Sequence, residues 1–190
     1  MTSNPNRSTL ESNLATAQQN GDAAAQAQCL MALAQIAHDE KEYALSQALY
    51  AQARDASDRA QDKKGKAEAL IALAQSLISG DLSEQRTACT YFAEALALYE
   101  QLGDQDEQIK LFIALGYAYW RLDENEIRIP LYQKALALLE QYKDPTLQSA
   151  YSIELGGSMY GHPDFAPLYE KALHLHQQAE YRRKTAADNL

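Results

Sequence analysis

Apolar residues recur at helical spacing along the chain, in segments separated by short polar or glycine-containing stretches. Residues 109–142 show the pattern best, as two helical segments joined by a short polar stretch. Its marker residues are Phe112, Leu115, Gly116 and Tyr119 in the first helix and Tyr132, Ala135 and Leu136 in the second. Alternating runs of Val, Ile and Thr, which are typical of strands, are missing from the sequence. The pattern therefore predicts an all-α fold.

The same pair of helices occurs four times. The first helices align on Leu33, Leu73, Leu115 and Leu155, which are 40, 42 and 40 residues apart. The second helices align on an aromatic residue followed three positions later by alanine: Tyr50 and Ala53, Phe92 and Ala95, Tyr132 and Ala135, Tyr169 and Ala172. We expect the aromatic ring to fill the space between neighbouring repeats, and the alanine to let the helix backbones approach. One helix pair cannot bury its apolar face alone, so four stacked pairs would share a core.

This pattern resembles the tetratricopeptide repeat, in which Leu-Gly or Leu-Ala is followed by a large residue and then by aromatic-x-x-Ala in the second helix. The best matching residues are Leu115, Gly116, Tyr119, Tyr132 and Ala135. The usual repeat has about 34 residues, so the chain is similar to longer variants such as kinesin light chains. The resemblance covers about residues 22–180. It implies a right-handed α-solenoid of four helix pairs, with an N-terminal capping helix and an extended C-terminal helix.

The expected organisation is one domain that begins with a disordered leader. Its segments are the leader 1–7, a capping helix 8–20, and repeats 22–61, 63–102, 105–142 and 144–186, the last with a C-terminal extension. Ser8 and Glu11 fit a capping box at the start of the first helix. Pro130 and Pro167 each lie two residues before an aligned aromatic. Because proline disrupts a helix interior, the second helices of repeats three and four should start late or kink there.

Charge and composition restrict the partners. The formal net charge is -9, which repels a phosphate backbone and argues against nucleic acid as a partner. The sequence has neither a secretory signal nor an apolar run approaching the roughly 18 residues of a membrane span, so we expect a cytoplasmic protein with no membrane partner. Cys29 and Cys89 fit reduced, buried thiols better than a disulfide or a reactive thiol. The basic run 181–184 fits either a solvating helix end or a docking tail for an acidic partner.

Candidate chemistry is sparse. His174 and His176 are two residues apart on a predicted helix, so their side chains point in different directions and make a poor metal pair. His162 lies in a loop, and His38 ends a helix. Metalloprotease, phosphate-loop and nucleophile-elbow motifs are missing from the sequence. We therefore expect no enzyme activity, no metal site and no cofactor.

The best candidate site is the surface that the first helices present to an inner groove, as the resemblance implies. The predicted partner-binding residues are Gln28, Met31, Gln35, Glu68, Ile71, Gln75, Lys110, Ile113, Tyr117, Trp120, Arg121 and Ile153. In repeat four the stripe also contains Gly157 and Tyr160. Trp, Tyr and Arg are typical interface anchors. The alternative is that Tyr117 and Trp120 pack against neighbouring helices.

These observations favour a non-catalytic adaptor that binds a peptide or helical segment of another protein. An assembly or secretion chaperone with one client protein is the alternative. Self-association through Tyr and Leu side chains at the ends of the array is a third, weaker hypothesis. The sequence does not identify the partner.

Overall fold

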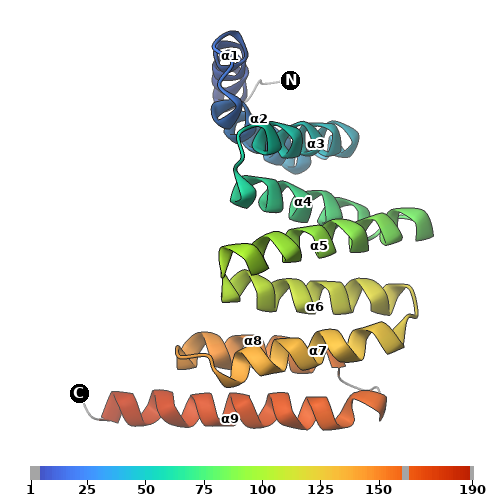
Figure 1. The fold of residues 1–190 in the computed structure, drawn as a ribbon, viewed down its shortest axis with the longest axis vertical. Helices are drawn as coiled ribbons and strands as arrows, with labels where there is room; N and C mark the ends of the chain where they lie inside the picture. The colour runs from blue at the N-terminus through green and yellow to red at the C-terminus, as the bar shows by residue number, and fades with distance from the viewer. Residues whose placement is uncertain (1–4, 160–162, 189–190) are drawn as a thin grey trace. The chain divides into compact units, whose positions relative to one another are not determined.

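The computed structural model describes residues 5–159 and 163–188, and within these ranges it contains nine α-helices, one short 3-10 turn and no strand (Figure 1). The helices are α1 (Pro5–Gln19), α2 (Ala23–Asp39), α3 (Tyr43–Arg59), α4 (Lys63–Leu77), α5 (Leu82–Leu102), α6 (Gln105–Arg121), α7 (Asn125–Glu140), α8 (Pro145–Met159) and α9 (Ala166–Asp188). The all-α prediction is therefore confirmed. The first four residues of the predicted leader, Tyr160 and His162 lie outside the described residues.

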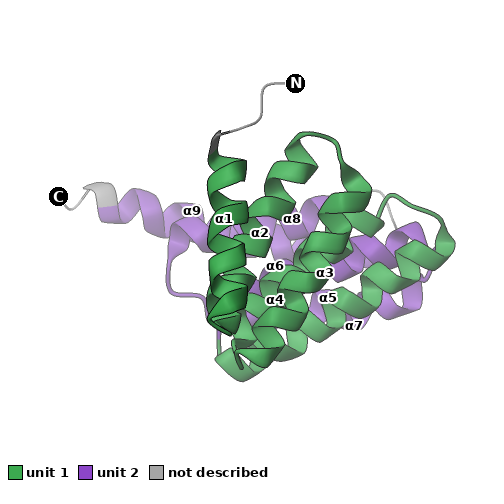
Figure 2. Ribbon diagram, turned by 90° about the horizontal axis from the view of Figure 1, so that it is seen from above, with its two compact units in different colours: residues 1–103 green, residues 104–190 purple. Residues whose placement is uncertain are grey.

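Consecutive helices pack in the predicted pairs, α2 with α3, α4 with α5, α6 with α7 and α8 with α9. The chain divides into two compact units, residues 1–103 and residues 104–190 (Figure 2). In unit 1, α1 packs on α2, and α3 packs on both α2 and α4. In unit 2, α8 contacts both helices of the preceding pair. The boundary between the units falls between α5 and α6.

Aspartate side chains fix the start of most first helices. Asp22, Asp62 and Asp104 each accept a hydrogen bond from a backbone amide in the first turn of the helix that follows. Asp81 and Glu84 form a complete capping box at the start of α5. The first helix differs from the prediction, because α1 begins at Pro5 and Ser8 lies inside it. Proline is tolerated in a first helical turn, where its missing amide hydrogen has no acceptor.

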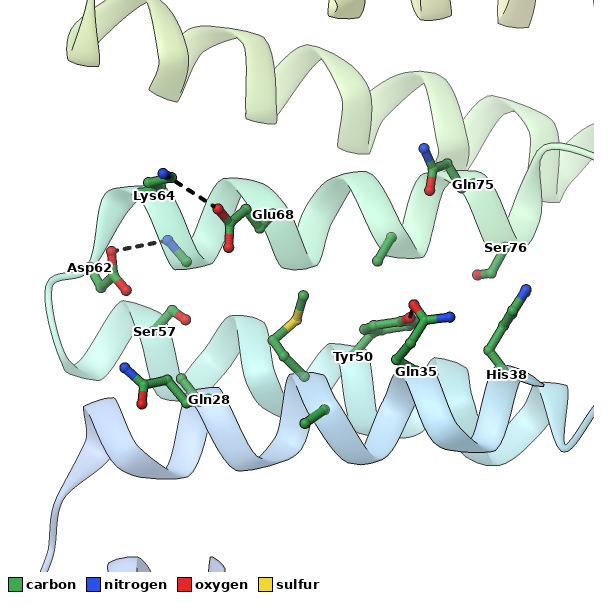
Figure 3. A pocket seen from close by; sticks show the side chains of 15 residues that line it. Gln28, Gln35, His38, Tyr50, Ser57, Asp62, Lys64, Glu68, Gln75 and Ser76 are labelled. Carbon is green, nitrogen blue, oxygen red and sulfur yellow. Dashed lines mark hydrogen bonds and ion pairs between the residues drawn. The ribbon is translucent and has the colours of Figure 1, made fainter. Parts of the chain in front are cut away.

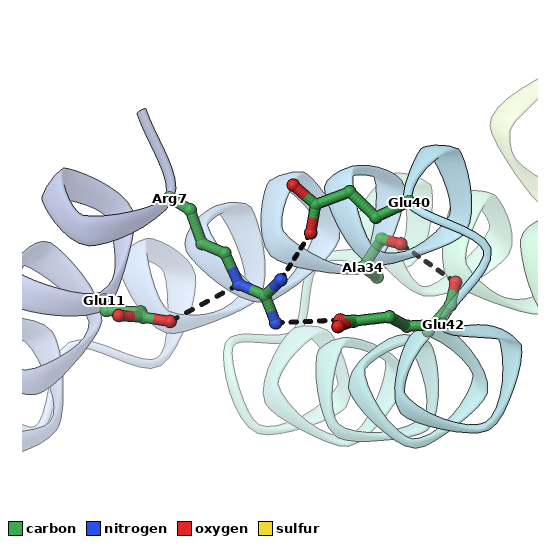
Figure 4. A network of polar contacts seen from close by, with 6 residues as sticks. Arg7, Glu11, Ala34, Glu40 and Glu42 are labelled. Carbon is green, nitrogen blue, oxygen red and sulfur yellow. Dashed lines mark hydrogen bonds and ion pairs between the residues drawn. The ribbon is translucent and has the colours of Figure 1, made fainter. Parts of the chain in front are cut away.

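Polar contacts tie α1 to the turn between α2 and α3 (Figure 4). Arg7 donates hydrogen bonds to the carboxylates of Glu40 and Glu42, the second over 3.0 Å. The hydrogen bond to Glu42 is the main cause that raises the pKa of Arg7 above its usual value. The two helices that flank this turn are themselves linked, because the Ser46 hydroxyl of α3 donates to the carbonyl of Ala34 of α2. These contacts hold the capping helix on the first repeat.

The aligned aromatic residues pack within their own helix pair as well as between repeats. The Tyr132 ring lies so close to Gly116, on the other helix of its pair, that a Cβ atom at Gly116 would be 2.1 Å from it. Tyr50 contacts Ala34 of its own repeat and Leu73 of the next. The small residue after the aligned leucine therefore makes room for the aromatic ring. This role is in addition to the close approach of helix backbones.

The predicted late start at a proline is confirmed in one helix and wrong in the other. Pro167 is the second residue of α9, after the 3-10 turn Pro163–Phe165, so the predicted late start of this helix is confirmed. Pro130 lies inside α7, which begins at Asn125, so the predicted late start is wrong there. Pro130 is exposed, and water can solvate the carbonyl that its missing amide leaves without a donor. The sequence analysis gave a kink at Pro130 as the alternative to a late start, and this kink stays a prediction.

Both cysteines are free thiols, as the sequence predicted. Cys89 is buried in α5, whereas Cys29 is only half-buried in α2. Among the described helices, none combines the length and the apolar character that crossing a membrane requires.

Candidate functional site

A groove of about 800 Å³ lies in unit 1, with walls from α2 and α4 and a floor from α3 (Figure 3). The predicted binding residues that line it are Gln28, Met31, Gln35, Glu68 and Gln75. Ile71, the sixth candidate in this unit, is half-buried on α4 and does not line the groove. The structure thus brings together five candidates from two helices that are about 40 residues apart in sequence.

The surface of this groove combines apolar contacts with amide groups. Met31, Ala32 and Ala72 provide the apolar part. Gln28 and Gln75 are exposed, and neither makes a hydrogen bond with another described residue. Amide side chains carry both donors and acceptors, which is what the backbone of an extended peptide requires.

Gln35, on the α2 wall of the groove, is held in place by two hydrogen bonds. The Tyr50 hydroxyl donates to Gln35 Oε1 over 3.1 Å, and Gln35 Nε2 donates to Asp39 Oδ1 over 2.9 Å. Burial raises the pKa of the Tyr50 phenol above its usual value, so the phenol remains a donor at neutral pH. This side chain is therefore preorganised, whereas Gln28 and Gln75 are available.

One end of the groove contains a polar group that the sequence analysis missed. Ser57 is fully buried, and its Oγ atom has no hydrogen-bond partner in the described part of the chain. A Cβ atom at Gly65 would lie 2.9 Å from this oxygen, so glycine permits the close approach of α4. Ser57 follows Tyr50 by seven residues, which is two helical turns, and this spacing could have placed it on the same face. On the rim, Lys64 and Glu68 form an ion pair of 3.9 Å.

Unit 2 contains an exposed aromatic pair on α6. The rings of Tyr117 and Trp120 are 5.6 Å apart, and the two residues are 45% and 51% exposed. Arg121 and Lys110 of the same helix are also exposed, and Lys110 pairs with Glu107 over 2.6 Å. The predicted alternative, in which neighbouring helices cover both rings, does not fit this exposure.

The remaining two predicted binding residues, Ile113 and Ile153, differ in their exposure to solvent. Ile113 is only 6% exposed and belongs to the core, so it presents little surface to a partner. The sequence placed it on the stripe because helical spacing does not show how many sides of a helix are covered. Ile153 is 57% exposed on α8 and lines a groove between α8 and α9.

One cluster in unit 2 has the residue types of a catalytic triad but not its geometry. The Ser149 hydroxyl donates to Glu180 Oε1 over 2.9 Å and lies 2.8 Å from His176 Nδ1. In a catalytic triad the carboxylate orients the histidine, which then takes the proton of the serine. Here the carboxylate accepts a hydrogen bond from the serine hydroxyl and does not orient the histidine. The cluster therefore links α8 to α9. Across the described residues, no three His, Cys, Asp or Glu side chains are grouped so as to hold a metal ion.

Four helix pairs, with a small residue against the aligned aromatic in repeats one, three and four, define a tetratricopeptide-like solenoid fold. The chain is similar in structure to BtubC (BKLC) from P. vanneervenii, a bacterial kinesin light chain, with a TM-score of 0.65 and 19% sequence identity. The match covers 87% of this chain and 66% of BtubC, so the chain spans slightly less than two thirds of that protein. At this identity the similarity establishes the fold alone. No family model and no curated protein matches the sequence.

Proposed function

We propose that this chain is a non-catalytic adaptor that binds an extended peptide segment of another protein in the groove of unit 1. The observation that carries this proposal is the pair of exposed amides, Gln28 and Gln75, on opposite walls above an apolar strip. A peptide lying between α2 and α4 would place apolar side chains on Met31 and Ala72. Its backbone would exchange hydrogen bonds with the two amides. The volume of about 800 Å³ is in the usual range for ligand sites.

A selection from a phage-displayed library of random peptides, panned on the full chain, would supply ligands for this groove. Affinities for the selected peptides would be measured by fluorescence anisotropy. The double variant Gln28→Ala/Gln75→Ala should bind about 10- to 30-fold more weakly, because each lost hydrogen bond is worth about 1 kcal/mol.

Gln52→Ala is the matched control, because Gln52 is an exposed glutamine on α3 that does not line the groove. It should keep the wild-type affinity, and circular dichroism should show the same helix content for all variants. Equal affinity of the wild type and the double variant would place the bound peptides elsewhere and contradict the proposal.

We also propose Tyr117, Trp120 and Arg121 as anchors for a partner segment in unit 2. Half-exposed aromatic rings beside a guanidinium group are typical of interface hot spots. Trp120 is the only tryptophan of the chain, so its fluorescence reports directly on this surface. A partner that covers it should shift the Trp120 emission to shorter wavelength, and Tyr117→Ala should weaken its binding at least tenfold. An unchanged emission spectrum at saturation would remove this surface from the interface.

A further inference from the structure

One face of α9 corresponds to the face of α3 that α4 covers in unit 1. In unit 1, α4 packs against α3, and Tyr50 and Ser57 of α3 are buried. At the corresponding positions of α9, Tyr169 and His176 are only half-buried. Leu173 is 42% exposed, whereas the aligned Leu136 is fully buried. This face of α9 therefore has the residues of a helix-packing surface without a covering helix in the described structure.

Beside this face, α8 and α9 enclose a groove with two adjoining parts. The smaller part, about 240 Å³, lies at Gly157, Tyr169 and Leu173, and the larger, about 810 Å³, extends to Lys184. Both parts are lined by Ile153 and His176, so they form one path along α9. From Tyr169 to Lys184 a helix rises about 22 Å, the length of a helix of about 15 residues.

A buried hydroxyl in the smaller part gives independent evidence for a ligand. Ser152 is 1% exposed, lines this part of the groove, and has an Oγ atom without a hydrogen-bond partner in the described residues. An unsatisfied buried polar atom is costly, and a ligand donor or acceptor would relieve the cost. The same part of the groove has open space at Gly157, where an added Cβ atom would meet no atom within 4 Å.

The charges along the groove determine which ligand it suits. Arg183 pairs with Glu180 over 2.8 Å, and Lys184 forms no ion pair with any described residue, so the far end carries a net positive charge. In unit 1 the covering helix also pairs opposite charges with the helix beneath it, since Lys66 near the start of α4 pairs with Asp58 near the end of α3 over 2.7 Å. The position of α9 that aligns with Asp58 is Gln177, and the basic end of α9 lies about two helical turns beyond it. A helix that packs antiparallel on α9 and extends along the groove to Arg183 and Lys184 needs acidic residues in its first turn. Such residues are also favoured there by the helix dipole.

We propose that the face formed by α8 and α9 binds an amphipathic helix of a partner protein, antiparallel to α9. The acidic first turn of this helix would lie at Arg183 and Lys184. Its apolar stripe would cover Leu173 and Ile153. The antiparallel direction follows from unit 1, where α4 follows α3 after a short turn and packs back against it. This site is separate from the groove of unit 1, and it goes beyond the proposed function.

The test uses the full chain and a peptide made from α4, which already packs on a second helix in this fold. The probe is a fluorescein-labelled peptide of residues 62–78 with Lys63→Glu, Lys64→Glu and Lys66→Glu, and the native peptide 62–78 is its matched control. In a fluorescence anisotropy titration, the acidic probe should bind at least tenfold more tightly than the native peptide. The protein variant Arg183→Glu/Lys184→Glu should reverse this preference, because its groove end becomes acidic.

Gly157→Leu provides a second, steric test, because the new side chain would fill the open space and leave the helix intact. It should weaken probe binding at least tenfold. Ala97→Leu, an equally exposed substitution on α5, should have no effect. Binding of the probe that is insensitive to Gly157→Leu, or equal affinity for the two peptides, would overturn the proposal. A second outcome would also overturn it: light scattering shows that the wild type is a dimer and that Gly157→Leu dissociates the dimer. In that case a second copy of the chain would occupy the face.

Discussion

At the scale of single residues, two helical glycines have opposite roles. Gly116 makes room for the buried ring of Tyr132, whereas Gly157 faces open space on α8. The first glycine is required by packing. The second only costs conformational entropy, which is the usual effect of glycine within a helix.

This contrast predicts opposite effects of the same substitution. Gly116→Ala should lower the free energy of unfolding by about 1–3 kcal/mol, because the new Cβ atom overlaps the fully buried ring of Tyr132. Gly157→Ala should raise it by up to about 1 kcal/mol through helix propensity. Urea denaturation followed by circular dichroism measures both changes. A Gly116→Ala variant as stable as the wild type would show that the ring has room to shift.

The buried phenol of Tyr50 makes a prediction for alkaline pH. Burial raises its pKa in the folded state above the usual value of 10.0, so its contribution to stability is complete below pH 10 and is lost as the pH rises through the folded-state pKa. Tyr50→Phe should cost about 1 kcal/mol at pH 7 through the lost hydrogen bond to Gln35. The variant should lose less stability than the wild type above pH 10.

Thermal unfolding at pH 7 and between pH 9 and 11.5 tests this. Tyr181→Phe is the control, because Tyr181 is highly exposed and its substitution should leave both the stability at pH 7 and the alkaline slope unchanged. Parallel alkaline slopes for Tyr50→Phe and the wild type would contradict the assigned role of the Tyr50 phenol.

At the scale of secondary-structure elements, a buried arginine joins α7 to the end of α8. Arg128 donates to Asn125 Oδ1 over 2.6 Å and to the carbonyl of Ser158 over 2.9 Å. Its guanidinium carbon lies 4.6 Å from the ring centre of Phe165 in the 3-10 turn. A cation that binds a carbonyl near a helix C-terminus also complements the helix dipole. One side chain thus connects three elements of unit 2.

Replacing Arg128 should loosen this connection. Arg128→Met keeps much of the apolar volume but removes the hydrogen bonds, and it should lower the free energy of unfolding by about 2 kcal/mol, because hydrogen bonds to charged groups are stronger than neutral ones. Amide hydrogen exchange should become faster in α8. Lys184→Met, at an exposed cation, should leave both quantities unchanged. Unchanged exchange in α8 of Arg128→Met would mean that the helix pair holds without this contact.

At the scale of the whole molecule, the chain consists of two compact units that meet in sequence at Gly103 and Asp104. Gly103 ends α5 in the left-handed conformation, with φ of 71°, and Asp104 caps α6. Each unit contains two repeats, and unit 1 also has its capping helix. In repeat proteins, stability is approximately a sum over repeats and their neighbour interfaces.

Residues 1–103 should therefore fold as an isolated fragment. The helix content per residue should match that of the full chain, and unfolding by urea should be cooperative, because the contacts among α1 to α5 lie within the fragment. Circular dichroism and urea titration measure both. A fragment ending at residue 80, which loses α5, is the comparison and should be less stable. A non-cooperative transition of fragment 1–103 would show that the first two repeats require unit 2.

The sequence by itself determined the helices, their pairing and the repeat length, because these depend on local periodicity and on landmarks that recur every 40 to 42 residues. Five of the predicted partner-binding side chains line the unit 1 groove, and their binding role stays a prediction. Helical spacing identifies a face, and this is enough where a face points to solvent.

Only the tertiary structure decided which faces are covered. It buried Ile113, left Tyr117 and Trp120 half-exposed, and brought the unsatisfied hydroxyls of Ser57 and Ser152 into two grooves. It also continued α7 through Pro130, whose exposure allows water to solvate the freed carbonyl. Burial and hydrogen bonding depend on neighbours that are distant in sequence, and a local pattern carries no information about them.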